Sequence, residues 1–350
     1  MSNLNSAIIQ EQAILYYKNN LNPIIITCGD INGIGPEISL KSIKHFDKTN
    51  KHFVFIIPKN VFEKAATLVN FTNDFEAVKD FSGLNFGNKN INFLLLPKAS
   101  LKTGRPTINS GQVSFDALEA ARKIIEAKFS DMLVTAPISK ESFELAKIDF
   151  PGHTELLGSW FKSDKFLMSF ISKSFKAALV TIHEPISKVP NLLSKKSMEK
   201  KLDVLINSIK YDFGKSNFSL AILGLNPHAG ENGRIGNEEI EILLPTIKKY
   251  SYYNIQGPFV PDAFFANQLY RKFDFILGMY HDQILIPFKL INFIKGVNFT
   301  AGLPIIRTSP DHGTAFDIAW QNRADETSMI EAIKWAIKIK RHRLNFLNDK

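Results

Sequence analysis

The sequence contains a single cysteine, Cys28, so no disulfide can form within the chain and a CxxC redox site is excluded. No uninterrupted apolar run approaches the ~18–20 residues of a membrane span. Residues 1–23 lack the basic start and apolar segment of a secretion signal. We therefore expect a cytoplasmic protein with no membrane partner, whose 350 residues bury a substantial core without disulfide or metal staples.

Acidic residues are outnumbered, since 34 Asp and Glu face 43 Lys and Arg, for a net charge of +9. This excess raises nucleic-acid binding as a function class. The basic residues are nevertheless spread over the whole chain, and the densest run lies in the last turns of a predicted helix, where cations are favoured: Lys334, Lys338, Lys340, Arg341 and Arg343. We therefore expect no nucleic-acid partner.

Short apolar runs, rich in β-branched and aromatic residues, alternate with stretches of helical period. The predicted strands are Ile24–Cys28, Phe53–Ile57, Ile91–Leu96, Met132–Thr135, Ala177–Ile182, Ser219–Leu223 and Phe275–Met279. Helical stretches include Leu118, Ala121, Ile125 and Phe129 after a start at Ser110 and Gly111, and Lys201–Tyr211 after a surface connection. The alternation predicts an α/β fold of mostly parallel sheets with helices on both faces. We expect residues 1–350 to form one catalytic unit of two interleaved lobes with the active site in the cleft between them.

The first predicted strand runs into a glycine-rich turn, residues 29–37, that contains Gly29, Gly33 and Gly35 before Pro36. Such a turn would let backbone N–H groups approach an anion. Its spacing matches neither G-x-G-x-x-G nor the P-loop. An anion site and a purely structural turn both stay open.

Three histidines, His183, His228 and His281, each follow a predicted strand. Because parallel strands end at the same sheet edge, their imidazoles could converge on a divalent metal and leave positions open for substrate. The alternative is three structural histidines. Their separations are too long for a zinc finger.

A second group of residues suits anion binding. His153 lies in the segment PGHTE, where Thr154 also fits a helix cap. Lys289, Asn298 and Arg307 are donors of the kind that bind phosphate or carboxylate, although each alone is also typical of a protein surface.

Together these segments resemble the 4-hydroxythreonine-4-phosphate dehydrogenase family of pyridoxal phosphate biosynthesis, whose fold belongs to the isocitrate and isopropylmalate dehydrogenase group. The resemblance spans roughly residues 23–340. It rests on seven segments: GD..GIGPE (29–37), PGHTE (151–155), GLNPHAGE..G..E (224–238), GPF..D..F (257–265), YHDQ....FK (280–289), GVN (296–298) and GLP.IRTS.DHGTA.D (302–317).

The resemblance implies a homodimer whose active sites are shared between subunits, and it assigns site residues. The implied ligands of a divalent cation (Zn, Mg or Co) are His183, His228 and His281, and the implied substrate contacts are His153, Thr154, Lys289, Asn298 and Arg307. The implied reaction is oxidation of 4-phosphooxy-L-threonine by NAD, or by NADP, followed by decarboxylation. Asp262 and Asp282 are candidate catalytic carboxylates, with loop and helix-cap roles as alternatives. From the related dehydrogenases we place His312 and Asp317 near the adenosine end of the cofactor.

Two segments depart from the family pattern. Ile31-Asn32 stands where relatives commonly carry Pro-Ala, and Trp320-Gln321-Asn322 stands where they carry Gly-x-Gly. The first departure alters a turn near the ligand cleft, and the second alters backbone approach near the cofactor.

Other functions are compatible with the same residues. A related dehydrogenase could act on another phosphorylated hydroxy acid, such as a threonate 4-phosphate, because the quoted residues recognise metal, phosphate and carboxylate rather than an amino group. A metal-dependent phosphohydrolase is a second alternative. A basic, non-enzymatic nucleic-acid binder is a third, and the dispersed lysines argue against it.

Overall fold

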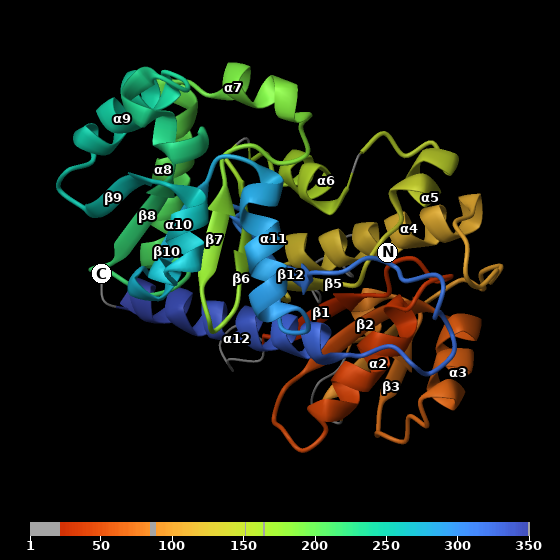
Figure 1. The fold of residues 1–350 in the computed structure, drawn as a ribbon. Coiled ribbons are helices and arrows are strands. Elements are labelled where there is room, and N and C mark those ends of the chain that lie inside the picture. Colours follow the sequence, from red (N-terminus) through yellow and green to blue (C-terminus); the bar gives the residue numbers. More distant parts are fainter. Residues whose placement is uncertain (1–21, 85–88, 151, 164, 349–350) are drawn as a thin grey trace. The chain divides into compact units, whose positions relative to one another are not determined.

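The computed structural model describes residues 22–84, 89–150, 152–163 and 165–348. The chain divides into two compact units (Figure 1), each built from two separate stretches. Unit 1 comprises Met1–Leu157 and Pro304–Ile337, and unit 2 comprises Gly158–Leu303 and Lys338–Lys350. The chain passes from one unit to the other within helices α6 (His153–Trp160) and α12 (Thr327–Asn348), and again between Leu303 and Pro304.

The described part of unit 1 has six strands that are all parallel to their neighbours, in the order β3-β4-β2-β1-β5-β12. Four of them are buried along their whole length, as expected of strands covered on both faces: β1 (Ile24–Thr27), β2 (Phe53–Pro58), β5 (Met132–Thr135) and β12 (Ile306–Pro310). The other elements are β3 (Glu76–Val78), β4 (Ile91–Leu96), α2 (Gly35–His45), α3 (Lys59–Leu68), η1 (Phe81–Gly83), α4 (Ile108–Glu126) and α5 (Lys140–Leu145).

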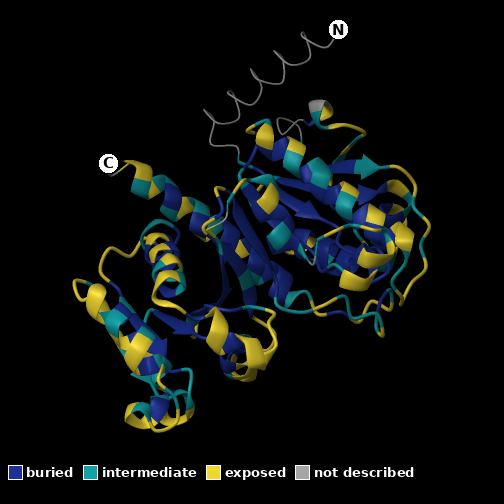
Figure 2. Cartoon of the chain, turned by 90° about the horizontal axis from the view of Figure 1, so that it is seen from above, coloured by how far each residue is buried: buried dark blue, intermediate teal, exposed yellow. Residues whose placement is uncertain are grey.

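The strands of unit 2 follow the order β11-β6-β7-β10-β8-β9, in which β6 is antiparallel to both neighbours. Their bounds are β6 (Leu167–Ile171), β7 (Lys176–Leu179), β8 (Ser219–Leu223), β9 (Asn254–Phe259), β10 (Phe275–Gly278) and β11 (Val297–Ala301). The remaining elements are η2 (Ile186–Lys188), α7 (Val189–Leu192), α8 (Lys195–Tyr211), η3 (Pro227–Gly233), η4 (Glu239–Leu243), α9 (Leu244–Lys249), α10 (Pro261–Ala266), η5 (Leu269–Lys272) and α11 (His281–Asn292). Figure 2 shows buried strands and helices with exposed outer faces.

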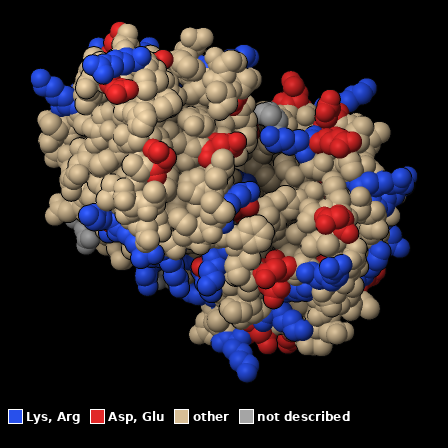
Figure 3. All heavy atoms as spheres, in the orientation of Figure 1, with Lys and Arg blue, Asp and Glu red and all other residues tan. Residues whose placement is uncertain are grey.

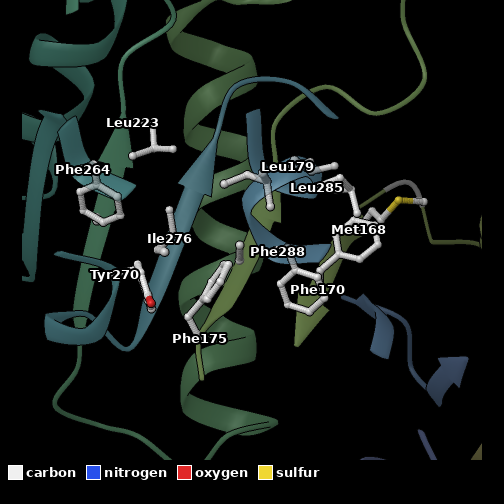
Figure 4. Close-up of a cluster of buried hydrophobic side chains, with 13 residues drawn as sticks. Met168, Phe170, Phe175, Leu179, Leu223, Phe264, Tyr270, Ile276, Leu285 and Phe288 are labelled. Carbon is white, nitrogen blue, oxygen red and sulfur yellow. The ribbon is translucent and has the colours of Figure 1, made fainter. Parts of the chain in front are cut away.

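A cluster of buried aromatic and aliphatic side chains fixes α11 on the sheet of unit 2 (Figure 4). The ring of Phe288, on α11, lies 5.8 Å from that of Phe170 on β6 and 5.2 Å from that of Phe175, which directly precedes β7. Such aromatic pairs contribute about 0.5–1.5 kcal/mol each beyond the burial of their surface. The cluster therefore anchors the helix whose first residue is His281.

The predicted α/β fold with mostly parallel strands is confirmed, and every predicted strand is present. The run expected at Ala177–Ile182 forms the shorter β7, and the two antiparallel pairings of β6 were not expected. Helix α4 begins two residues before Ser110, because Thr107 is its N-cap and accepts a hydrogen bond from the Ser110 backbone N–H. Helix α8 likewise begins at Lys195 behind the cap Ser194, within the segment expected to be a connection.

The basic run near the C-terminus lies inside α12 rather than in its last turns, because the helix continues to Asn348. Figure 3 shows acidic side chains interspersed among the lysines and arginines of the visible face. None of the helices in the described part of the chain combines the length and apolar character needed to cross a membrane.

Candidate functional site

A buried arginine, Arg307, is the second residue of β12 in unit 1. The Arg307 side chain donates hydrogen bonds to Thr135 Oγ1 from Nε at 3.2 Å and from Nη2 at 2.9 Å. The two residues meet because β12 and β5 are parallel neighbours and Thr135 is the last residue of β5. Burial lowers the pKa of Arg307 to about 10, and the Glu155 carboxylate opposes this shift. At neutral pH Arg307 is therefore a buried cation, which favours an anionic ligand.

His153 begins α6 and is 9% exposed. Its Nε2 atom is buried and has no hydrogen-bond partner among the described residues. Burial, and then the charge of Arg307, hold the pKa of His153 well below its usual value, so the imidazole is neutral at neutral pH. Thr154, the next residue in the sequence, is also buried. A buried polar atom without a partner is the property expected of a group that binds a ligand.

In unit 2 the structure brings His183 and His281 together. Their ring centroids lie 5.6 Å apart, with His183 in the turn after β7 and His281 at the start of α11. Asp282 Oδ1 lies 2.6 Å from His281 Nδ1. A carboxylate on one ring nitrogen leaves the other free to bind a metal, the usual arrangement of a metal-ligating histidine. The donor chemistry of this pair fits a divalent cation.

His228 does not join this pair in the described part of one chain, where no group of three His, Cys, Asp or Glu side chains could hold a metal ion. It lies exposed in η3, which begins at Pro227, after β8 ends at Leu223. Five consecutive residues of η3, His228 to Asn232, have positive φ angles between 43° and 78°. A left-handed run of this length is costly for residues other than glycine, at roughly 1–2 kcal/mol each. The surroundings of η3 must therefore hold it in place.

The remaining candidate residues of unit 2 lie at different degrees of exposure. Lys289 is exposed in the last turn of α11. Asn298 lies on β11, and its Oδ1 atom is buried without a hydrogen-bond partner among the described residues. Asp262 is exposed in the first turn of α10, a position where a carboxylate stabilises a helix start. Of these three, Asn298 has the unsatisfied atom that points to a ligand.

The segment proposed for the cofactor follows β12 in unit 1. His312 Nδ1 lies 3.1 Å from the Gly313 carbonyl oxygen, and Asp317 is exposed. The pKa of Asp325 is lowered by a hydrogen bond from Thr327 and, less strongly, by His312, which places His312 near that carboxylate. A Cβ added at Gly313 would meet no atom within 4 Å. Internal packing therefore does not require glycine there, and the open space fits the approach of a ligand.

The glycine-rich turn after β1 is structural in this chain. Its backbone N–H groups bond internally: Asp30 N donates to Pro137 O, Gly33 N to Asp30 O and Ile34 N to Thr314 O. A Cβ at Gly35 would lie 2.2 Å from the Cys28 carbonyl oxygen. The glycines allow close packing, and these three N–H groups are not free to bind an anion.

The same turn contains a buried carboxylate that the sequence analysis missed. Asp30 accepts hydrogen bonds from the Ser110 and Ser142 hydroxyls and from the Asn32 backbone N–H. Burial raises the pKa of Asp30, and these hydrogen bonds partly offset the shift. Asp30 therefore ties β1 to the starts of α4 and α5. Nothing in the sequence pattern places Ser110 and Ser142 near it.

The two departures from the family pattern contact each other. The indole N–H of Trp320 donates to the Ile31 carbonyl oxygen at 2.9 Å, and the Lys64 ammonium lies 4.8 Å from the indole centroid. The buried Asn32 side chain donates to the Arg105 carbonyl oxygen and to Thr107 Oγ1, and its Oδ1 accepts from Lys102 N. The unusual residues thus make specific bonds of their own.

The chain is similar to known proteins of one family. The model of the family "Pyridoxal phosphate biosynthetic protein PdxA" matches residues 48–336. A relative from Sulfurihydrogenibium sp., named 4-hydroxythreonine-4-phosphate dehydrogenase, is 39% identical over 322 residues, which cover 91% of this chain and 99% of the relative.

Two solved structures are also similar. The 4-hydroxythreonine-4-phosphate dehydrogenase of Klebsiella pneumoniae has a TM-score of 0.79 and 32% identity, and the match covers 91% of this chain and 98% of that chain. A terephthalate 1,2-cis-dihydrodiol dehydrogenase of Burkholderia xenovorans has a TM-score of 0.62, 22% identity and the same coverages, and it shares the fold.

Proposed function

Because the chain belongs to the family of the pyridoxal phosphate biosynthetic protein PdxA, we propose that it oxidises 4-phosphooxy-L-threonine at its C3 hydroxyl. A hydride passes to NAD, or to NADP, and a proton is released, which gives 2-amino-3-oxo-4-phosphooxybutanoate. This β-keto acid loses CO₂ to form 3-amino-2-oxopropyl phosphate, used to make pyridoxine 5'-phosphate. The observation that carries the proposal is a buried pair. The charge of Arg307 helps to lower the pKa of His153, whose buried Nε2 atom has no hydrogen-bond partner among the described residues.

The anionic groups of the substrate are bound by the chain's own donors. Arg307 supplies a buried cation, and neutral His153 supplies an uncharged ring nitrogen. Thr154, the residue after His153, supplies a hydroxyl group. Lys289 and Asn298 add an ammonium and an amide. We propose that these five side chains bind the substrate and fix its reacting carbon, where misplacement by ~1 Å can cost about 100-fold in rate.

The imidazoles of His183 and His281 would hold a divalent cation, Zn, Mg or Co. Because one described chain does not bring His228 to this pair, His228 would complete the ligand set in the proposed homodimer with shared active sites. When bound, the cation supplies Lewis-acid stabilisation of negative charge on the substrate oxygen in both the oxidation and the decarboxylation. Asp282 orients the His281 ring through Nδ1 and is a candidate to move a proton. Asp262 is the second candidate. The cofactor would lie at His312 and Asp317, beside the open Gly313.

The first experiment tests the reaction itself. Purified protein is expected to form NADH from NAD and 4-phosphooxy-L-threonine, and a chelator should abolish this reaction until a divalent cation is restored. A panel with threonate 4-phosphate and NADP identifies the substrate and cofactor preferences. Phosphate release without NADH would instead establish the phosphohydrolase, and unchanged turnover in metal-free protein would eliminate the cation from the mechanism.

We also propose that a second copy of the chain covers one face of unit 2. Five large apolar side chains, which we name the α11 patch, are exposed there: Ile286 (59%), Leu290 (82%), Ile291 (38%), Phe293 (84%) and Ile294 (46%). Exposed apolar clusters of this kind mark interfaces. The patch is continuous in sequence with His281 and Lys289 on the same helix, which supports a homodimer with shared active sites.

A double variant tests this surface. Leu290→Asp with Phe293→Asp is expected to yield monomers by light scattering and to lower kcat/KM, because two buried carboxylates without partners oppose assembly. The control is Leu347→Asp, which places the same charge on another exposed apolar residue, 54% exposed near the end of α12. A dimer that survives the double substitution would refute the α11 patch as the interface.

The cytoplasmic location of the protein stays a prediction.

A further inference from the structure

The turn that carries His228 has an unusual backbone, which folds around a single carboxylate. Glu239, the first residue of η4, is 2% exposed. Its Oε1 atom accepts hydrogen bonds from the backbone N–H groups of Leu225 at 2.7 Å and of Asn226 at 2.8 Å. Its Oε2 atom accepts one from the Asn226 side-chain amide at 2.9 Å. Glu239 therefore fixes the chain immediately before His228.

The same carboxylate also packs against the residues after His228. A Cβ at Gly230 would lie 2.6 Å from Glu239 Oε2, and a Cβ at Gly224 would lie 3.2 Å from Oε1. The Ala229 backbone N–H donates to the Asn226 carbonyl oxygen, which closes the turn around His228. The left-handed run is thus folded around the Glu239 carboxylate on both sides of the histidine.

We propose that Glu239 is a positioning residue, which sets the place of the His228 imidazole by holding its left-handed turn. The inference rests on the proposed function, in which His228 binds the divalent cation. In this proposal Glu239 does not bind the cation itself, because its Oε1 atom accepts two backbone N–H groups and its Oε2 atom accepts the Asn226 side-chain amide. Its effect reaches the cation only through the backbone of residues 225–230.

The test measures binding of Co²⁺ to the purified protein by its visible absorption, without substrate. Glu239→Gln replaces one acceptor oxygen by an NH₂ group that faces backbone donors. Loss of a group that orients a metal ligand typically costs about 10–100-fold in metal affinity. We expect that fall in Co²⁺ affinity, and recovery of kcat when the cation is raised to saturation.

Two matched variants define the comparison. Glu241→Gln removes the same charge from an exposed position of the same η4 turn and should leave Co²⁺ affinity unchanged. Asn226→Ala removes the side-chain hydrogen bonds to Glu239 Oε2 and Glu238 Oε2 but keeps both backbone bonds to Glu239 Oε1. It should give a smaller fall, of about threefold to tenfold, and it provides the measurement if Glu239→Gln does not fold.

His228→Ala separates the two hypotheses. If His228→Ala weakens Co²⁺ binding and neither Glu239→Gln nor Asn226→Ala does, the positioning role is wrong and the proposed function stands. If His228→Ala leaves Co²⁺ affinity intact, His228 is not a ligand, and both the metal assignment and the positioning role fail. A fall for Glu239→Gln that matches the fall for Glu241→Gln would also refute the inference, since charge alone would explain it.

Discussion

Replacing Arg307 by methionine is expected to lower kcat/KM for the phosphorylated substrate by about 100- to 1000-fold, mainly through a higher KM. Removing one partner of a buried, hydrogen-bonded charge pair costs ~2–5 kcal/mol, and each ~1.4 kcal/mol is a factor of ten. Arg307 is 3% exposed, so water cannot replace the lost contacts to a bound anion. Methionine retains much of the side-chain volume, which keeps the β5–β12 packing.

A spectroscopic readout distinguishes loss of the cation from general damage. The charge of Arg307 is, after burial, the second cause of the low pKa of His153. In Arg307→Met the pKa of His153, followed by NMR, should therefore rise towards its ordinary value while remaining below it. Arg341→Met, at an exposed position of α12, should change neither KM nor that pKa. A wild-type KM in Arg307→Met would exclude Arg307 from the substrate site.

The strands that the sequence predicts best are those buried on both faces. Apart from Thr27, the runs Ile24–Cys28 and Phe53–Ile57 contain only apolar residues, so their hydrophobicity identifies them directly. The strands that were missed carry polar residues or breakers. β12 contains Arg307 and two hydroxyl residues, and β9 contains Gly257 and Pro258. Hydrophobic runs cannot detect a strand whose residues serve a ligand or a turn.

The candidate site divides in the same way. His183, His228 and His281 are predicted to meet because each follows a strand of one sheet. The structure places the rings of His183 and His281 together, but His228 does not join them in the described part of one chain. Glu239 and Asp30 were not predicted as site or anchor residues. Their roles depend on which N–H and hydroxyl groups the folded chain brings to them across 13 to 112 residues of sequence. Periodicity and spacing contain no information on such contacts.

A buried ion pair in unit 2 should produce the largest stability effect. Arg343, in α12, donates from Nε to Asp212 Oδ1 at 2.7 Å, and the Ser208 hydroxyl donates to Asp212 Oδ2 at 2.6 Å. The two side chains are 5% and 2% exposed, and the Arg343 guanidinium lies 5.0 Å from the Tyr211 ring centroid. The pair therefore holds the last part of α12 against the end of α8.

Arg343→Ala is expected to lower the free energy of unfolding by about 3–5 kcal/mol in urea titrations, because it leaves the Asp212 carboxylate buried without its cation. Arg341→Ala, its exposed neighbour on α12, should stay within about 0.5 kcal/mol of the wild type. The double variant Asp212→Leu with Arg343→Met should recover most of the loss, since replacing both charges by apolar groups is often neutral. A loss below about 1 kcal/mol for Arg343→Ala would show that water reaches Asp212 and that the pair is not buried in solution.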